Sequence, residues 1–487
     1  MRRARFVLAI IAIIAGTARF LAAATPAGTE FQVNTFTLDA QAYPQICTGG
    51  NGNFVVTWES RGQDGSGNAV IARRFGSDGG PLDGEFQVNT YTSGNQQFPA
   101  IACDQAGDFV VAWEGRQEDG NSYGVFAQRF RSDGGRLGTE FQVNTYTPDR
   151  QLSAAVCMAP SGDFVVTWNS YGQDGDGYGI FGQRFGSDGA QRGTEFQVNT
   201  YTNYTQEYPA MTCGGSGDFV VVWVSDYQDG DDYGIFGQRF ASSGAMKGTE
   251  FQVNTYTYYA QQSPAVSSDA AGDFVVVWST YQYTTGYSYG IFGQRFGSSG
   301  APLGTEFQAN TYTSYVQQSP AVSSDPCGNF TVVWSGGTDG DGYGIFGQLF
   351  DKSGAPVGTQ FQVNTYTTGD QGTFSALGHV VDVAADGTGN FTVVWQSENQ
   401  PNDSSSFGVF GQRYAQDICS LSACIGDCNG DGQVTINELV LSVDIALDVF
   451  PLSDCPAINP SGIGNVTVDN VVRAVQASLT GCSGSQG

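Results

Sequence analysis

The sequence is poor in basic residues and in histidine. It has 20 Lys+Arg against 47 Asp+Glu, which gives a formal net charge of −27 at pH 7. A surface this acidic repels phosphate backbones, which excludes nucleic acid as a partner and disfavours anionic membranes. The single histidine, His379, has no nucleophile motif or metal-binding motif beside it, so we interpret it as part of an ordinary inserted hairpin.

Long apolar runs are scarce as well, and the one that stands out lies at the N-terminus. A short segment with three arginines, Met1–Arg5, precedes an apolar run at Phe6–Gly16, and small residues follow at Ala22–Ala24. This order is typical of a secretory signal peptide over residues 1–24, and the run is too short to span a bilayer permanently. We therefore expect cleavage near Ala24 and a secreted or cell-surface protein with no membrane span. An uncleaved anchor is the alternative.

Cysteine occurs ten times, an even number that favours disulfides in an exported chain. The last five follow residue 418 and indicate a small disulfide-rich domain, although five is odd and the pairing stays open. The cysteines are Cys47, Cys103, Cys157, Cys213, Cys327, Cys419, Cys424, Cys428, Cys455 and Cys482.

An internal repeat dominates the chain. Hydrophobic residues make up 40% of it and aromatic residues 13%, enough to build a sizeable core. The phrase Phe-Gln-Val-Asn-Thr, or a one-letter variant, begins at Phe31, Phe86, Phe141, Phe196, Phe251, Phe307 and Phe361. Every tryptophan falls in one register, at Trp58, Trp113, Trp168, Trp223, Trp278, Trp334 and Trp395. One large aromatic residue at one position of each copy indicates the core of a repeat architecture.

Each copy has the composition of β-strands. Residues 219–223, Phe-Val-Val-Val-Trp, are apolar at both odd and even positions, whereas residues 251–255 alternate between apolar and polar. Asp-Gly turns such as residues 173–177 supply the positive φ angles that hairpins need. With a further strand near Pro264, each copy holds about four strands. We therefore predict an all-β fold over residues 28–416, a seven-bladed β-propeller of about 55-residue four-stranded repeats.

The two ends of the repeat array are complementary. The first copy opens with a strand at residues 30–37 that has nothing before it to pair with, and the last copy ends at residues 412–414 with no such strand after it. A ring closed by the N-terminal strand leaves no strand edge unpaired at the ends of the array. The alternatives, a β-solenoid or a string of small sandwiches, leave two unpaired edges.

The copies resemble those of a family of secreted bacterial repeat proteins. Such copies read Gly-Asp-Phe-Val-Val-Val-Trp, then Asp-Gly-x-Gly-Tyr-Gly-Ile-Phe-Gly-Gln-Arg-Phe, then Glu-Phe-Gln-Val-Asn-Thr. The resemblance implies a secreted propeller-like array and implies no catalytic residue.

Two charged positions each recur in six of the seven copies, which we interpret as structural, and on that ground we predict that the chain is not an enzyme. Glycoside hydrolysis needs two carboxylates with different pKa values, but the repeated glutamates share one register. The arginines also repeat, unlike the distinct cluster of sialidase propellers. These residues are Glu30, Glu85, Glu140, Glu195, Glu250 and Glu306, with Arg74, Arg129, Arg184, Arg239, Arg295 and Arg413.

Alternating strands bring the turns after the Val-Trp strands and the loops that enter the next copy to one face. That face collects Tyr201, Tyr204, Tyr256, Tyr258, Tyr259, Tyr312 and Tyr315 with Asp174, Asp176, Asp229, Asp231, Asp339 and Asp341. Tyrosine rings beside carboxylates suit sugar rings or protein partners, so we predict a ligand face for an extracellular glycan or protein. Solvated turn residues, chosen for turn geometry, are the alternative.

Residues 427–438 read Asp-Cys-Asn-Gly-Asp-Gly-Gln-Val-Thr-Ile-Asn-Glu and predict a Ca²⁺ site. Ca²⁺ takes six to eight hard oxygens, which a twelve-residue loop supplies around a sharp glycine turn, here Gly432. The predicted ligands are Asp427, Asn429, Asp431, the Gln433 carbonyl, Thr435 and bidentate Glu438.

A second copy of this loop, residues 459–470, has lost its carboxylates and is interpreted as a structural partner of the first. The pair resembles dockerin modules, and more broadly secreted EF-hand pairs, over residues 424–482. The dockerin resemblance implies docking to a cohesin-like receptor. Because Glu438 stands where dockerins usually carry Asp, we keep docking as one option and carry over only the calcium binding. We predict a linker at residues 417–424 and a small disulfide-rich α-helical EF-hand (dockerin-like) domain at 425–487.

We therefore interpret the chain as a secreted calcium-binding protein whose propeller binds carbohydrate or protein. The alternatives are a polysaccharide-degrading enzyme tethered through the dockerin-like module and a structural cell-surface protein.

The calcium loop generates a first prediction. Replacing Glu438 by alanine removes the bidentate carboxylate, so the Ca²⁺ affinity of the full chain should fall by about tenfold or more. Calorimetric titration measures the change, with Asn470→Ala at the matching place in the second loop as the control. Equal affinities for Glu438→Ala and the wild type would show that the ligand assignment is wrong.

Overall fold

The computed structural model describes residues 24–116, 118, 120–282, 288–337, 339–372, 379–398, 406–416, 441 and 445. The chain divides into two units, of which Ala23–Gln416 contains all the strands described below. The predicted calcium ligands and the second loop lie outside the described residues. Within the described part of the chain, no helix is long and apolar enough to cross a membrane.

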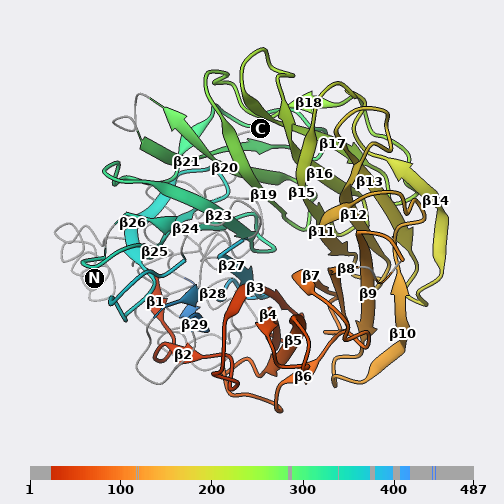
Figure 1. Ribbon diagram of the computed structural model, residues 1–487. Helices are drawn as coiled ribbons and strands as arrows, with labels where there is room; N and C mark the ends of the chain where they lie inside the picture. Colours follow the sequence, from red (N-terminus) through yellow and green to blue (C-terminus); the bar gives the residue numbers. More distant parts are fainter. Residues whose placement is uncertain are drawn as a thin grey trace, which may run out of the picture. The chain divides into compact units, whose positions relative to one another are not determined.

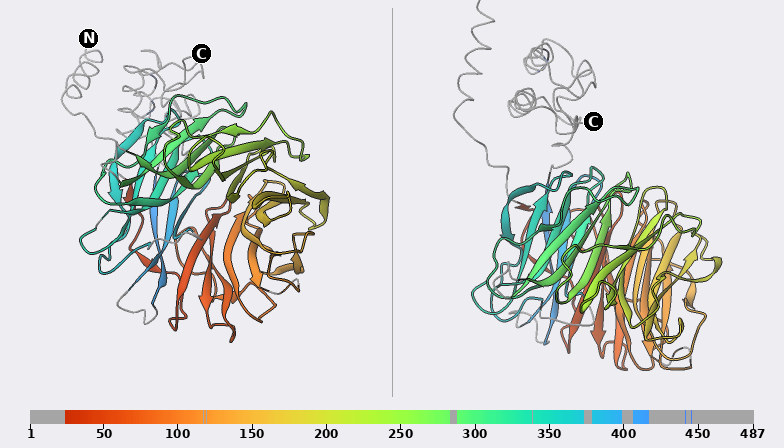
Figure 2. Two further views of the ribbon diagram at one scale, coloured as in Figure 1. Left: turned by 45° about the horizontal axis from the view of Figure 1, so that its top comes forward. Right: turned by 90° about the horizontal axis from the view of Figure 1, so that it is seen from above.

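Seven antiparallel sheets surround a central axis, which confirms the predicted seven-bladed propeller of four-stranded repeats (Figures 1 and 2). The inner strands are β3 (Gln41–Thr48), β7 (Gln96–Cys103), β11 (Gln151–Met158), β15 (Gln206–Cys213), β19 (Gln261–Ser268), β23 (Gln317–Ser324) and β27 (Val381–Ala385). The second strands are β4 (Phe54–Arg61), β8 (Phe109–Arg116), β12 (Phe164–Tyr171), β16 (Phe219–Asp226), β20 (Phe274–Gln282), β24 (Phe330–Gly336) and β28 (Phe391–Ser397).

The outer half of each blade completes the sheet. The third strands are β5 (Asn68–Phe75), β9 (Tyr123–Phe130), β13 (Tyr178–Phe185), β17 (Tyr233–Phe240), β21 (Ser288–Phe296), β25 (Gly344–Phe350) and β29 (Gly408–Ala415). The outermost strands are β6 (Phe86–Gln87), β10 (Arg136–Gln142), β14 (Gln191–Gln197), β18 (Phe251–Gln252), β22 (Phe307–Gln308) and β26 (Pro356–Gln362) in blades 1 to 6, with β1 (Thr25–Pro26) and β2 (Phe31–Gln32) in blade 7.

The core lies between the blades. All seven tryptophans of the second strands are 0% exposed. Trp278 of blade 5 shares a cluster with Val220 and Val222 of blade 4, because the Phe-Val-Val-Val-Trp strand has apolar side chains on both faces. Each blade therefore covers its neighbour, and truncation of one tryptophan to alanine would cost about 3–5 kcal/mol.

A buried amide network explains the asparagine of the Phe-Gln-Val-Asn phrase. Asn199 Oδ1 accepts a hydrogen bond from Ile180 N at 2.8 Å, and its Nδ2 donates to Gln206 Oε1 at 3.1 Å. Asn34 accepts the same bond from Val409 N at 2.8 Å in blade 7. The asparagine thus fixes the end of the third strand relative to the inner strand that follows.

The repeated glutamates bind the preceding blade. Glu195 accepts hydrogen bonds from Thr145 N at 2.6 Å and from Thr145 Oγ1 at 2.8 Å. Glu30 accepts the corresponding two hydrogen bonds from Thr365 N and Thr365 Oγ1, both at 2.7 Å. The repeated arginines donate to backbone carbonyls of a neighbouring turn, as Arg184 does to Ser242 O at 2.7 Å. Both sets of residues are structural in these contacts.

The N-terminal segment completes blade 7. In β2, Phe31 pairs with Gly411 and Gln32 with Phe410 of β29, so the first and last strands of the array share one sheet. Two disulfides, Cys47–Cys103 and Cys157–Cys213, join the inner strands of neighbouring blades. The ring is therefore closed by strand pairing and reinforced by covalent links.

Ring closure generates a second prediction. Glu30→Ala should lower the free energy of unfolding by about 1–3 kcal/mol, because two hydrogen bonds to a charged acceptor are lost. Glu195→Ala, which removes the same pair of bonds between blades that are contiguous in sequence, is the matched control. Denaturant unfolding measures both. A Glu30→Ala chain as stable as the wild type would contradict the role of this contact in closure.

Candidate functional site

Each of the first six inner strands contains a bulge that faces the propeller axis. In blade 4 the register against β16 shifts between Glu207 and Ala210, and Tyr208 has a φ of 55°. A non-glycine residue with positive φ is strained, and such strain concentrates at functional sites. The bulge residues with positive φ are Tyr43, Phe98, Ser153, Tyr208, Ser263 and Ser319.

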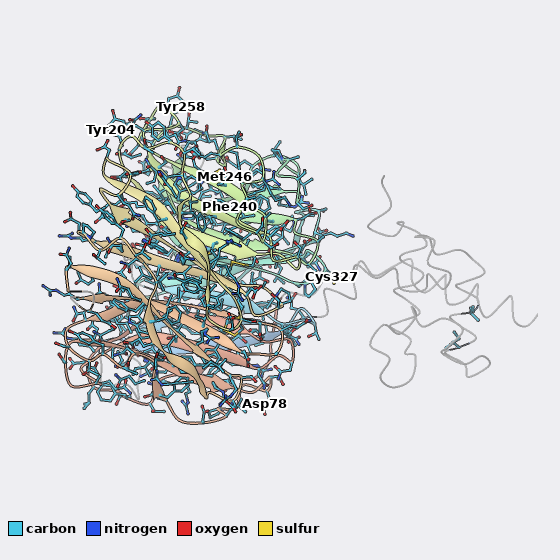
Figure 3. The ribbon with its side chains drawn as sticks, turned by 90° about the vertical axis from the view of Figure 1, so that its right-hand side faces the viewer. Asp78, Tyr204, Phe240, Met246, Tyr258 and Cys327 are labelled. Atoms are coloured by element: carbon cyan, nitrogen blue, oxygen red, sulfur yellow. A yellow bond between two sulfur atoms is a disulfide. The ribbon has the colours of Figure 1, made fainter. Side chains whose placement is uncertain are left out.

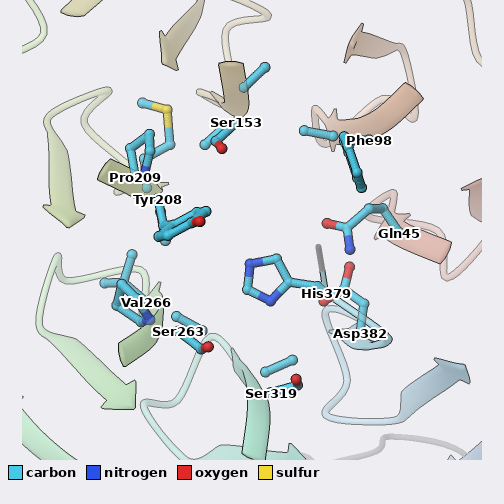
Figure 4. Close-up of a pocket in the computed structure, with 18 of the residues that line it drawn as sticks. Gln45, Phe98, Ser153, Tyr208, Pro209, Ser263, Val266, Ser319, His379 and Asp382 are labelled. Atoms are coloured by element: carbon cyan, nitrogen blue, oxygen red, sulfur yellow. The ribbon is translucent and has the colours of Figure 1, made fainter. Parts of the chain in front are cut away.

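These bulges line a cavity of about 460 Å³ on the axis. Figure 4 shows Phe98, Ser153, Tyr208, Ser263 and Ser319 arranged around it. The rings of Tyr43 and Phe98 pack together, with centroids 4.8 Å apart. The cavity thus combines aromatic surface with hydroxyl groups. No lysine or arginine is among the described residues that line it.

Two carboxyl groups and the histidine also line the cavity. Asp382 accepts hydrogen bonds from Ile46 N at 3.0 Å and Val383 N at 2.8 Å, and burial raises its pKa to about 7. Because Ile46 belongs to blade 1, Asp382 bridges blades 7 and 1.

Glu207 differs from the other buried carboxyl groups. It is half-buried, its backbone pairs with Val224 in the sheet, and its carboxyl group makes no hydrogen bond or ion pair with any residue that the structure describes. Burial, and to a smaller extent the negative charge of Asp226, raises the pKa of Glu207 to about 7. This carboxyl group is therefore available to a ligand and carries a proton for much of the time near neutral pH.

Glu59 and Glu114 use their carboxyl groups in the framework. Glu114 accepts a hydrogen bond from Ser153 N at 2.6 Å, and Glu59 accepts one from Phe98 N at 3.3 Å. Both carboxylates hold the bulge of the next blade, and burial raises the pKa of each to about 7.

His379 enters the cavity from the inserted segment of blade 7. The distance in sequence from Phe361 to Trp395 is 34 positions, against 27 from Phe31 to Trp58. Burial lowers the pKa of His379, so the imidazole is neutral near pH 7. Our interpretation of this histidine as part of an ordinary hairpin missed that its side chain lines the axial cavity.

The tyrosines of the predicted ligand face are largely exposed. Tyr258 is 65% and Tyr315 63% exposed, and Figure 3 shows Tyr204 and Tyr258 projecting at one end of the propeller. The exposed members of the set are Tyr204, Tyr258, Tyr259, Tyr312 and Tyr315, while Tyr201 and Tyr256 are half-buried. Rings pack in pairs there, as Tyr204 does with Tyr227 at 5.5 Å.

The aspartates of that face have structural partners. Asp174, Asp229 and Asp339 accept hydrogen bonds from the side chains of Asn199, Asn254 and Asn364. Asp176, Asp231 and Asp341 accept backbone N–H bonds from Tyr204, Tyr259 and Gly369. These carboxylates fix the loops that carry the tyrosines.

The predicted calcium ligands, Asp427, Asn429, Asp431, Gln433, Thr435 and Glu438, lie outside the described residues. Within the described ranges, no three His, Cys, Asp or Glu side chains are grouped so that they could hold a metal ion.

No protein-family model matches the sequence, and no curated protein is similar to it. Among solved structures, an α-L-arabinanase of Penicillium chrysogenum is 13% identical, with 79% of this chain and 98% of that one covered and a TM-score of 0.43. An α-L-arabinofuranosidase of Fusarium graminearum is 11% identical, covering 65% and 92%, with a TM-score of 0.43. The β-propeller domain of the Trilobed protease of Pyrococcus furiosus is 8% identical, covering 77% and 94%, with a TM-score of 0.42. These likenesses concern the fold alone.

The comparison corrects our prediction that the chain is not an enzyme. Two of the three proteins are named as an arabinanase and an arabinofuranosidase, so chains with a similar fold include enzymes. The prediction weighed only the carboxylates that recur at one register, in six of the seven copies. Glu207 and Asp382, which occur at their positions in single copies, were left out.

The sequence does contain a signal for the cavity. The inner strands begin Gln-x-Tyr-Pro, Gln-x-Phe-Pro or Gln-x-Ser-Pro in five copies, and Gln-x-Ser-Ala in blade 3. The third residue varies between a constant glutamine two positions before it and a proline that follows it in five copies, which marks a position that the framework does not dictate. The sequence does not reveal the bulge, however, and therefore does not show that this residue faces the axis.

The buried carboxylates generate a third prediction. The pKa of Glu114 is about 7 in the folded state, above the 4.5 of an exposed glutamate, so the fold binds more protons than the unfolded chain between these pH values and stability falls as pH rises through this window. Glu114→Gln should flatten that dependence and stabilise the protein at pH 8 by about 1–3 kcal/mol. Thermal unfolding at several pH values measures it, with Asp176→Asn at an exposed turn as the control. An unchanged pH profile for Glu114→Gln would refute the assignment.

Proposed function

We propose that the protein binds a neutral polysaccharide in the axial cavity. The single observation that carries this proposal is the lining itself: aromatic rings and serine hydroxyls converge on one space, with no lysine or arginine among the described lining residues. Concave, largely apolar sites with a few directed polar groups are typical ligand sites.

The chemistry of the lining suits a sugar. A pyranose or furanose ring presents C–H groups that pack on the faces of Tyr43, Phe98 and Tyr208, and hydroxyls that exchange hydrogen bonds with serines such as Ser153 and Ser263. An acidic polysaccharide would meet the acidic surface with no counter-charge in the described lining, so the neutral class is favoured.

The exposed tyrosines extend the proposed site. Tyr204, Tyr258 and Tyr315 lie in loops that enter the inner strands, and they offer stacking surfaces to sugar units beyond the cavity. Aromatic side chains are anchors in many interfaces because they bury much area at little cost in conformational entropy. A chain of sugars rather than a single one is thus the proposed ligand.

We further propose that this binding takes place outside the cell. The N-terminal residues 1–24 would direct export, residues 417–424 would form a linker, and residues 425–487 would hold Ca²⁺ through the loop at 427–438. A tail of this kind would attach the propeller to a cohesin-like receptor.

Binding generates a fourth prediction. Tyr208→Ser places at the bulge of blade 4 the residue that blades 3, 5 and 6 carry there with nearly the same φ, so the fold should be kept. Affinity electrophoresis in gels containing arabinan, xylan, galactan or mannan should show binding to at least one of them, weakened about tenfold or more by Tyr208→Ser.

Met246→Ser, a change at an exposed apolar side chain away from the cavity lining, is the control and should bind as the wild type does. Equal retardation of Tyr208→Ser and the wild type, or retardation of the wild type by none of the neutral polymers, would overturn the proposed function.

A further inference from the structure

We propose that the cavity also hydrolyses a glycosidic bond of the polysaccharide that it binds, with Glu207 as the proton donor. This inference rests on the proposed function, which supplies the substrate class. It goes further in assigning a reaction to one side chain.

The position of Glu207 is the first argument. It directly precedes the bulge residue Tyr208 in β15 and lines the cavity with Val224 and Tyr233. Gln97, at the same position in blade 2, donates a hydrogen bond to Glu114 at 3.3 Å, whereas Glu207 faces Val224, which offers no polar side chain. A carboxyl group without a structural partner is thus present in the wall of the site.

The surroundings of Glu207 are the second argument. The titratable groups whose charges act on it or respond to it are Asp226, Tyr208, Tyr233 and Tyr178. None of them is a cation, and burial together with the negative charge of Asp226 disfavours the carboxylate, so the group stays protonated to higher pH than an exposed glutamate. Retaining a proton near neutral pH is what a general acid requires.

A second carboxyl group supplies the base. Figure 4 shows Asp382 and Tyr208, the neighbour of Glu207, on opposite sides of the cavity. Asp382 and Glu207 are the carboxyl groups among the described lining residues. Hydrolysis of a glycoside uses one carboxylic acid on the leaving-group side and one carboxylate on the other side of the sugar.

The step balances with water as the co-reactant. The proton of Glu207 passes to the glycosidic oxygen, and the bond between that oxygen and the anomeric carbon breaks, with its electron pair moving to the oxygen. The oxygen of a water molecule bonds to the anomeric carbon, and its proton passes to the Asp382 carboxylate. Proton exchange with solvent restores both carboxyl groups, and no oxidation or reduction takes place.

The repeat itself provides a safe substitution. Gln97, Gln262 and Gln318 occupy the position of Glu207 in blades 2, 5 and 6, so Glu207→Gln introduces a residue that the framework already accommodates. The variant keeps the shape of the side chain and loses only the proton that it donates.

The experiment uses the full chain and the neutral polysaccharides that retard it in the binding gels, with release of reducing ends as the readout. The wild type should release reducing ends with an optimum near pH 7, because burial raises the pKa of both groups to about 7 and the active form needs Glu207 protonated and Asp382 ionised. Glu207→Gln should lower the rate by about 10²–10⁴-fold while the affinity is unchanged. With 2,4-dinitrophenyl glycosides of the same sugar, whose leaving group needs no proton, the loss should be at least tenfold smaller.

The outcomes separate the two proposals. Binding without release of reducing ends by the wild type would overturn the hydrolytic role and leave the proposed function standing. Equal release by Glu207→Gln and the wild type, or equal losses on the polysaccharide and the dinitrophenyl glycoside, would overturn Glu207 as the proton donor. Gln262→Glu, which places a carboxyl group at the same position of blade 5, should not restore activity to Glu207→Gln, and restoration would also refute the assignment.

Discussion

The contact between neighbouring blades is the interaction on which the rest of this structure depends. No blade covers its own tryptophan-bearing strand: Trp278 is buried by valines of blade 4, and the same arrangement recurs around the ring. A four-stranded sheet with two apolar faces is stable only between two others, so an open row would leave bare faces at its ends. Pairing of β2 with β29 removes those ends, and Glu30 then makes to Thr365 the contact that Glu195 makes to Thr145.

The same dependence shapes the axial cavity. In three blades the side chain that follows the tryptophan holds the bulge of the next blade: Glu59 binds Phe98 N, Glu114 binds Ser153 N and Gln396 binds Tyr43 N. Because these bonds involve the backbone of the bulge, its side chain is left to vary, and the three supported bulges carry phenylalanine, serine and tyrosine. The chemistry of the site therefore resides in the differences between copies.

Much of the fold could be predicted from the sequence, because one register recurs seven times. The tryptophans and the glutamates in the register of Glu30 point to contacts that recur between neighbouring blades. The complementary ends of the array point to the strand pairing that closes the ring. The site could be predicted only in part. The tyrosines were assigned to an exposed face, where Tyr258 and Tyr315 do lie, but the aspartates beside them bind loops. The sequence pattern assigned His379 to an ordinary hairpin and did not single out Glu207 or Asp382, although all three line the cavity. Each of these three occurs once, and a single residue has no periodicity to reveal it.

The sequence by itself determined the number of blades, their strands and the residues that join them, since hydrophobic period and repeated polar pairs act over short distances along the chain. Only the tertiary structure decided which side chains share the axis. Residues such as Tyr43, Tyr208 and Asp382 are far apart in sequence and meet because seven inner strands converge and six of them bulge. Whether a carboxyl group there accepts hydrogen bonds from backbone N–H groups, as Asp382 does, or has no partner among the described residues, as the Glu207 carboxyl group has none, depends on the packing of a blade that the local sequence does not specify.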